Sequence, residues 1–180
     1  MISDRGEYKE FSDVLNKKGF VKVAAPWTFR HPEFDTVIDI LPFGEIERSY
    51  TENFDQRSTD LHVIGFMEVL LDPRQVWIED TLVNIPTLPG FIILKMTAWS
   101  DRPEERGNDL GDILFIITSY YNLNWDFILD NHVELLDLLG DKGKDDEWII
   151  ATRVLGRESA AYLQKSEGLK KEFWKFQIKI

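Results

Sequence analysis

The spacing of apolar residues in the first third of the chain predicts one helix followed by three strands. The helix is expected over residues 7–18, where apolar residues recur at helical intervals before Gly19. The strands are expected at residues 20–24, 27–31 and 36–41, which are short apolar runs bounded by Pro, Gly and polar residues. A helix and three strands in rapid succession favour a mixed sheet with helices packed on it.

The pattern changes from strand to helix along the rest of the chain. A short helix is expected over residues 63–71 and a further strand over residues 75–85. From Pro86 onward the apolar period is helical, and helices are expected over residues 88–102, 108–121, 125–139, 147–163 and 168–180. We therefore predict an α/β (α+β) fold, with a core of strands and helices over residues 1–85 and a helical C-terminal bundle over residues 86–180.

A carboxylate interrupts the apolar run at residues 36–41, which the pattern predicts to be a buried strand. Asp39 shares one face of this strand with Val37 and Leu41, because side chains alternate across a strand. Burying an ionised carboxylate is costly unless a partner compensates its charge. Asp39 is therefore either a strand-end residue bonded to the backbone or to an arginine, or a metal-binding or general-base carboxylate.

Two pairs of charged residues in the helical part are further candidates. Lys95 and Arg102 are two helical turns apart, so they lie on nearly one face of an otherwise apolar helix. Such a pair can receive a phosphate chain, or can be two surface cations whose stems cover apolar surface. Asp109 and Asp112 are one turn apart. Acids at the start of a helix suit its dipole, and these two could also orient Lys95 or Arg102, or contact a ribose or a metal.

Composition removes several classes of site and partner. The 180 residues include no cysteine, which excludes disulfides, thiolate zinc sites and cysteine nucleophiles. A net charge of −11 argues against binding to duplex DNA. No apolar run reaches membrane-spanning length and the N-terminus lacks a signal-peptide pattern, so we expect no membrane association and a cytoplasmic location. A glycine-rich phosphate loop of the Walker or Rossmann type is also absent.

Five segments, taken in order, resemble the bacterial predicted nucleotidyltransferases related to AbiEii-type abortive-infection toxins, part of the polymerase-beta-like superfamily. The segments are VIDILPFGEIE (37–47), VIGFMEVL (63–70), PTLPG (86–90), LKMTAWSDR (94–102) and NDLGDI (108–113). The resemblance extends from about residue 7 to residue 121. It implies a mixed nucleotidyltransferase-like sheet in the predicted domain of residues 1–85.

The resemblance also implies a site. In this family three carboxylates bind two magnesium ions, which clamp a nucleoside triphosphate and activate an acceptor hydroxyl. Asp39 matches the third carboxylate, so its implied role is catalytic and metal-binding. Lys95 with Arg102 matches a motif that contacts the nucleotide, and Asp109 with Asp112 matches the motif that follows it.

The chain departs from the family pattern at two points. The Gly-Ser turn and Asp-x-Asp pair that should precede the first helix do not occur in residues 1–6. We expect either that the true start codon lies upstream of Met1 or that the protein is a natural remnant. One carboxylate cannot hold two metal ions, so we expect this chain to be inactive or impaired. Asn108 stands where a Lys or Arg usually precedes the first Asp of its motif.

Three functional hypotheses follow. The first is magnesium-dependent transfer of a nucleotidyl group from a nucleoside triphosphate to a hydroxyl of an RNA, a protein or a small molecule, with Asp39 in a cleft facing Lys95. The second is a non-catalytic module of the same fold that binds nucleotide or protein, as a homo-oligomer or with a cognate partner in a toxin–antitoxin-like system. The third is a structural domain in which Asp39 pairs with a cation such as Arg30.

Overall fold

The computed structural model shows a mixed α+β protein, which confirms the predicted class. Helices make up most of the residues that the structure describes, and strands a much smaller part. The residues that the structure describes are 5–23, 27–41, 51–52, 61–62, 64–140 and 143–177. Contacts divide the chain into two units, residues 1–67 and 68–180, and each is described by itself. The predicted boundary after Ile85 stays a prediction.

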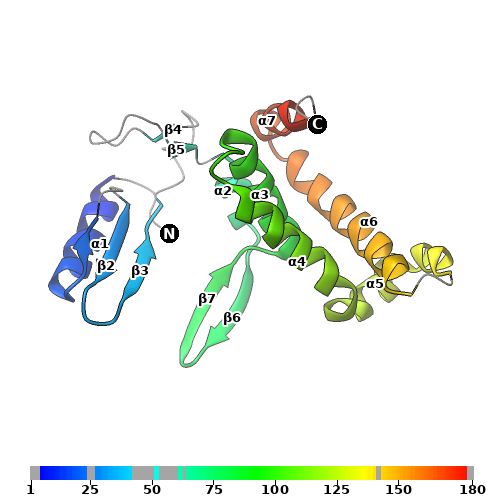
Figure 1. The fold of residues 1–180 in the computed structure, drawn as a ribbon, viewed down its shortest axis with the longest axis horizontal. Helices are drawn as coiled ribbons and strands as arrows, with labels where there is room; N and C mark the ends of the chain where they lie inside the picture. Colours follow the sequence, from blue (N-terminus) through cyan, green and yellow to red (C-terminus); the bar gives the residue numbers. More distant parts are fainter. Residues whose placement is uncertain are drawn as a thin grey trace. The chain divides into compact units, whose positions relative to one another are not determined.

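The first unit begins with a helix followed by strands, as predicted, but its described strands pair only antiparallel and not in the expected mixed sheet (Figure 1). Its elements are α1 (Arg5–Lys17), β1 (Val21–Lys22), β2 (Thr28–His31), β3 (Thr36–Asp39), β4 (Thr51–Glu52) and β5 (Leu61–His62). The helix ends before Gly19, whose φ of +91° lies in the left-handed region that glycine tolerates. The sheet order is β1-β2-β3, and β4 pairs separately with β5.

The core of the first unit lies between α1 and one face of the three-stranded sheet. Leu15, Phe29 and Ile40 are buried together there, and Tyr8, Phe20 and Ile38 pack against them. The predicted alternation along β3 is confirmed, because Ile38 and Ile40 contact the core whereas Val37 is 57% exposed. The prediction that the whole strand is buried is wrong. In the described part of the sheet β3 is an edge strand, and α1 covers the face opposite to Val37.

The second unit joins a β-hairpin to a set of packed helices. Its elements are β6 (Arg74–Ile78), β7 (Thr81–Ile85), α3 (Leu88–Asp101), α4 (Gly107–Leu123), α5 (Trp125–Asn131), the 3₁₀ helix η2 (Val133–Leu138), α6 (Lys144–Leu163) and α7 (Glu167–Gln177). A short helix, α2 (Phe66–Leu70), crosses the division between the units. The described helices include none long and apolar enough to cross a membrane.

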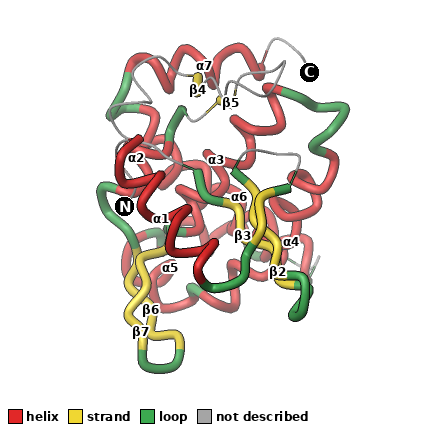
Figure 2. Tube along the Cα trace, turned by 90° about the vertical axis from the view of Figure 1, so that its left-hand side faces the viewer, coloured by secondary structure: helices red, strands yellow, loops and turns green. Residues whose placement is uncertain are grey.

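Two sequence-based elements of this unit need correction. The single strand predicted over residues 75–85 is a hairpin, because Glu79 has a φ of +51° and reverses the chain there. Figure 2 shows this hairpin as a two-stranded ladder extending from the helices of its unit. The helix predicted over residues 125–139 ends at Asn131, and a 3₁₀ helix follows His132, whose φ of −141° is not helical.

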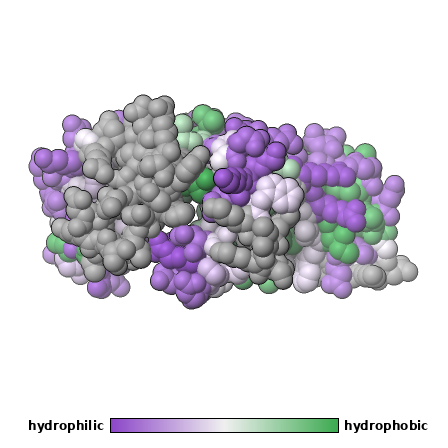
Figure 3. Space-filling model, turned by 90° about the horizontal axis from the view of Figure 1, so that it is seen from above, coloured by the Kyte–Doolittle hydropathy of each residue, from purple (hydrophilic) through white to green (hydrophobic). Residues whose placement is uncertain are grey.

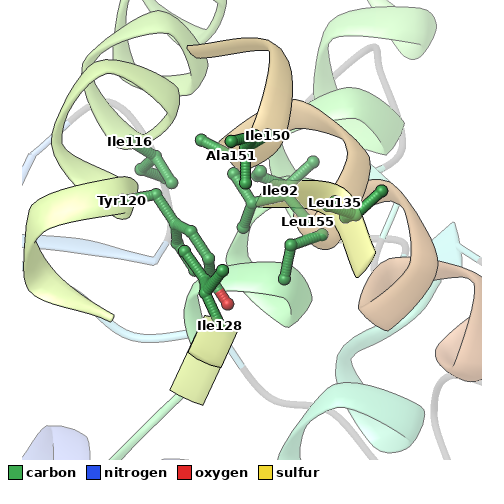
Figure 4. Close-up of a cluster of buried hydrophobic side chains, with 9 residues drawn as sticks. Ile92, Ile116, Tyr120, Ile128, Leu135, Ile150, Ala151 and Leu155 are labelled. Atoms are coloured by element: carbon green, nitrogen blue, oxygen red, sulfur yellow. The ribbon is translucent and has the colours of Figure 1, made fainter. Parts of the chain in front are cut away.

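The core of the second unit is formed by α3, α4, α5 and α6. Nine buried side chains point toward one another, and eight are labelled in Figure 4: Ile92, Ile116, Tyr120, Ile128, Leu135, Ile150, Ala151 and Leu155, with Val154 completing the cluster. Gly90 allows α3 to approach α2, because a Cβ atom there would lie 2.7 Å from Cγ1 of Val69. Figure 3 shows apolar patches among polar ones on the surface. The exposed apolar side chains of this unit include Leu129 on α5 and Val133 on η2.

Thr87 connects the start of α3 to α6 and gives a first prediction. Its hydroxyl accepts a hydrogen bond from the Gly90 N–H at 3.2 Å and lies 2.7 Å from the hydroxyl of Tyr162. We expect Thr87→Ala to lower the free energy of unfolding by about 1–2 kcal/mol, because it removes the helix cap and leaves Tyr162 without this partner. Thr118→Ala is the control, because the Thr118 hydroxyl is exposed and donates to the carbonyl of Phe115 in its own helix. Equal urea midpoints for the two variants would contradict the assigned role.

Candidate functional site

Three of the residues singled out in the sequence meet where α3 packs against α4. Lys95 lies near the middle of α3, and Asp109 and Asp112 lie in the first two turns of α4. The ammonium of Lys95 donates to Asp109 Oδ1 at 2.8 Å and to Asp112 Oδ2 at 2.6 Å. The loop between the helices reverses the chain, so two motifs that are separate in sequence form one cluster, which we name the Lys95 cluster.

The two carboxylates of the Lys95 cluster differ in how far they are buried. The Asp109 side chain is 7% exposed and that of Asp112 is 53% exposed, with Lys95 between them at 22%. The second oxygen of Asp109, Oδ2, is buried without a hydrogen bond to any described residue, and Nη1 of Arg106 lies 4.0 Å from it. Asp109 is therefore a fixed partner of Lys95, whereas Asp112 can exchange with solvent or a ligand.

The electrostatics of Lys95 reflect this balance. Burial by itself lowers its pKa, but the hydrogen bonds and negative charges of Asp109 and Asp112 outweigh burial and raise the pKa above its ordinary value. The ammonium also lies 5.3 Å from the centre of the Phe91 ring, which favours the charged form. Lys95 is thus a fully charged donor at neutral pH.

Arg102 lies at the end of α3, and its described ion pairs are with neighbouring acids. Its φ of −142° leaves helical geometry, so the spacing argument that put it on one face with Lys95 extends one residue too far. The guanidinium lies 3.2 Å from Asp101 Oδ2 and 3.7 Å from Glu105 Oε2. These acids hold Arg102 in the loop that leads to α4.

Asp39 lies at the end of β3 in the first unit and is exposed. Thr28, its neighbour across the sheet, donates a hydrogen bond from Oγ1 to Asp39 Oδ1 at 2.5 Å. The suggested partner Arg30 instead binds Asp35, so that pairing is wrong. Because Asp39 is exposed, it needs no compensating cation. The expected cleft between Asp39 and Lys95 joins residues of different units and stays a prediction.

The acidic residues do not combine into a complete metal site in the described part of the chain. No three His, Asp or Glu side chains are gathered there in a way that could hold a metal ion. Asp39 supplies one carboxylate, and the ammonium of Lys95 already lies between Asp109 and Asp112 where a cation would bind. The residues described do not fit a two-magnesium centre, and no catalytic step is derived through one.

A second group of polar residues was not predicted from the sequence. Tyr120, Glu158 and Tyr162 line a cavity of about 270 Å³ together with residues from the base of the β6–β7 hairpin. Glu158 also lies 3.2 Å from His132, whose ring contacts Arg157. No motif or spacing indicated this group, because its members come from separate elements that meet only in the folded unit.

In the Lys95 cluster, charged residues from two of the predicted motifs are in direct contact. Its chemistry is that of a charged donor held by one buried and one exposed carboxylate. Comparisons with protein-family models, with curated proteins and with solved structures found no match to this chain.

Proposed function

We propose that the chain is a nucleotidyltransferase-like protein that binds a nucleoside triphosphate at the Lys95 cluster. The observation that supports this proposal is the contact of Lys95 with Asp109 and Asp112. By the resemblance, Lys95 belongs to the motif that contacts the nucleotide, and Asp109 and Asp112 belong to the motif that follows it. The contact between these residues brings the two motifs together.

The two carboxylates suggest how the cluster receives a phosphate. Lys95, Asp109 and Asp112 together carry a formal charge of −1, which repels a bare triphosphate. A magnesium-complexed nucleotide carries less negative charge, and its phosphate oxygens can replace the exposed Asp112 as partner of Lys95. Asp109, which is buried, keeps the ammonium in place during this exchange.

The reaction class is transfer of a nucleotidyl group. An acceptor hydroxyl oxygen forms a bond to the α-phosphorus, the bond from that phosphorus to pyrophosphate breaks, and the hydroxyl proton passes to a base. The resemblance gives the role of base to Asp39, which belongs to the first unit. A non-catalytic nucleotide-binding module is the alternative. It is favoured by the exposed position of Asp39 and because no three His, Asp or Glu side chains are gathered to hold a metal ion among the described residues.

Nucleotide binding tests the proposal directly. Calorimetry with each of the four magnesium–nucleoside triphosphates is expected to detect binding of at least one, and Lys95→Met to weaken it at least tenfold by removing a charge-assisted donor. Lys170→Met is the matched control, because Lys170 is also ion-paired, with Glu167 on α7. The double variant Lys95→Met/Asp109→Leu separates loss of binding from misfolding, because it removes both members of the buried pair.

The possible outcomes distinguish the two functions. Binding to wild type that Lys95→Met and the double variant both lose supports the site, and equal affinity in all proteins contradicts it. Transfer from an α-labelled triphosphate to RNA or to protein, abolished by Asp39→Asn, identifies an enzyme. Binding without transfer identifies the non-catalytic module.

A further inference from the structure

The second unit contains a cavity that is separate from the Lys95 cluster. It has a volume of about 270 Å³ and lies where the start of α3, the end of α4 and the side of α6 meet the base of β6. The residues that give it chemistry are Asp72, Arg74, Tyr120, Phe127, Glu158 and Tyr162. Pockets for drug-sized ligands usually range from about 300 to 1,000 Å³, and this cavity is slightly smaller, so it suits a ligand smaller than these.

Tyr120 is one of two buried tyrosines that line this cavity. Only 3% of its surface is exposed, yet among the residues that the structure describes its hydroxyl has no hydrogen-bond partner. The hydroxyl of Tyr162 differs, because it lies 2.7 Å from Thr87 Oγ1. The Tyr120 hydroxyl oxygen is not among the buried atoms without a partner, so it is open to the cavity, where it can bond to a ligand atom.

The protonation of Tyr120 determines which atoms it can bind. Burial, and then the negative charge of Glu158, raise the pKa of Tyr120 to about 12. The phenol is therefore neutral at physiological pH, and its oxygen can accept a hydrogen bond while its O–H donates one.

The charged residues at the cavity have both signs. Asp72 and Arg74 form no ion pair within the described part of the chain, and Glu158 contacts His132 at 3.2 Å. Two carboxylates suit an ammonium group, and the guanidinium of Arg74 suits a carboxylate. Asp72 and Arg74 are exposed, so they are available to a ligand that carries both charges.

We propose that this cavity binds a free α-amino acid or a zwitterion of similar size. The ammonium group donates to Glu158 and to the phenol oxygen of Tyr120. The carboxylate accepts from Arg74, and the remaining part of the ligand contacts the rings of Phe127 and Tyr162. Aromatic walls beside an ammonium add a cation–π attraction.

Calorimetry with the twenty amino acids, each tested singly, examines this proposal. At least one is expected to bind, and its N-acetyl and methyl-ester derivatives, which lack one charge each, to bind at least tenfold more weakly. Tyr120→Phe and Arg74→Gln are each expected to weaken binding at least tenfold. Tyr121→Phe and Arg153→Gln are matched controls, because these residues do not line the cavity.

A stability measurement shows that the effect of Tyr120→Phe is local. Because the Tyr120 hydroxyl has no partner in the described residues, its removal should leave the urea midpoint of the free protein near that of wild type at pH 7. Absence of binding by all twenty amino acids overturns the proposal. So does binding that survives both Tyr120→Phe and Arg74→Gln, and so does equal affinity for acetate or ethylamine, which would make the cavity a simple ion site.

Discussion

Replacing Phe29 with alanine is expected to unfold the sheet and helix of the first unit. Phe29 is completely buried between α1 and the sheet, and Leu15 and Ile40 are the only other buried members of its described cluster. Large-to-small changes at such sites cost about 3–5 kcal/mol. A cluster this small has little other burial to offset that cost, so we expect hydrogen-exchange protection of α1 and β2 to disappear.

Phe34→Ala is the matched control for this prediction. Phe34 has the same side chain but is 72% exposed in the turn between β2 and β3. Its removal is expected to change stability by about 0.5 kcal/mol or less. If exchange protection of α1 is equal in the two variants, Phe29 does not hold the helix to the sheet. Protection in α3 and α4 serves as an internal standard, because their core belongs to the second unit.

The order of elements could be predicted because local signals agree with the fold. The helical spacing before Gly19 and the strand patterns after it correspond to α1, β2 and β3. Apolar periodicity likewise identified α3, α4 and α6, whose buried faces meet in one core. These signals are read within one element, so they do not need knowledge of which segments pair.

Errors arose where exposure depends on the whole sheet. The apolar letters around Asp39 predicted a strand covered on both sides, but β3 is at an edge of its described sheet and has one covered face. Asp39 is on the open face and bonds to Thr28, so its place in an apolar run carries no energetic penalty that requires a metal. A run of four or five residues cannot report how many neighbours its strand has.

The candidate sites also show that sequence patterns predict contacts within one element better than contacts between elements. The spacing of Asp109 and Asp112 showed that they share a helical face, and the orientation of Lys95 by these acids was one of the interpretations left open. The structure supports it, because all three side chains are in contact. The cavity beside Tyr120 had no sequence signal, since its residues become neighbours only when α4 and α6 pack.

Replacing Lys95 with methionine is expected to destabilise the second unit as well as to weaken nucleotide binding. Asp109 would keep a buried negative charge after losing its closest cation, and such unpaired charges cost about 3–5 kcal/mol in fully buried pairs. Lys95 is partly exposed, so we expect a loss of about 2–4 kcal/mol in urea unfolding. Asp112→Asn is expected to cost about 1 kcal/mol or less, because its pair with Lys95 is half exposed.

The dependence of this loss on pH follows from the raised pKa of Lys95. A raised pKa in the folded state means that the ion pairs stabilise fully below the ordinary value of 10.5, and that this contribution falls as the pH rises through the folded-state pKa. The difference in free energy of unfolding between wild type and Lys95→Met should therefore be constant from pH 7 to 9 and should become smaller at more alkaline pH.

A double-mutant cycle then separates the pair from simple loss of packing. If the cost of Lys95→Met comes from the buried charge of Asp109, the variant Lys95→Met/Asp109→Leu recovers most of the lost stability, since neither charge remains. If the double variant instead loses as much free energy of unfolding as the two single variants together, Lys95 stabilises the unit by packing on Phe91 and its neighbours. If the double variant recovers stability but not nucleotide binding, the Lys95 ammonium has two roles. It pairs with Asp109, which fixes its position, and it binds the phosphate that replaces Asp112.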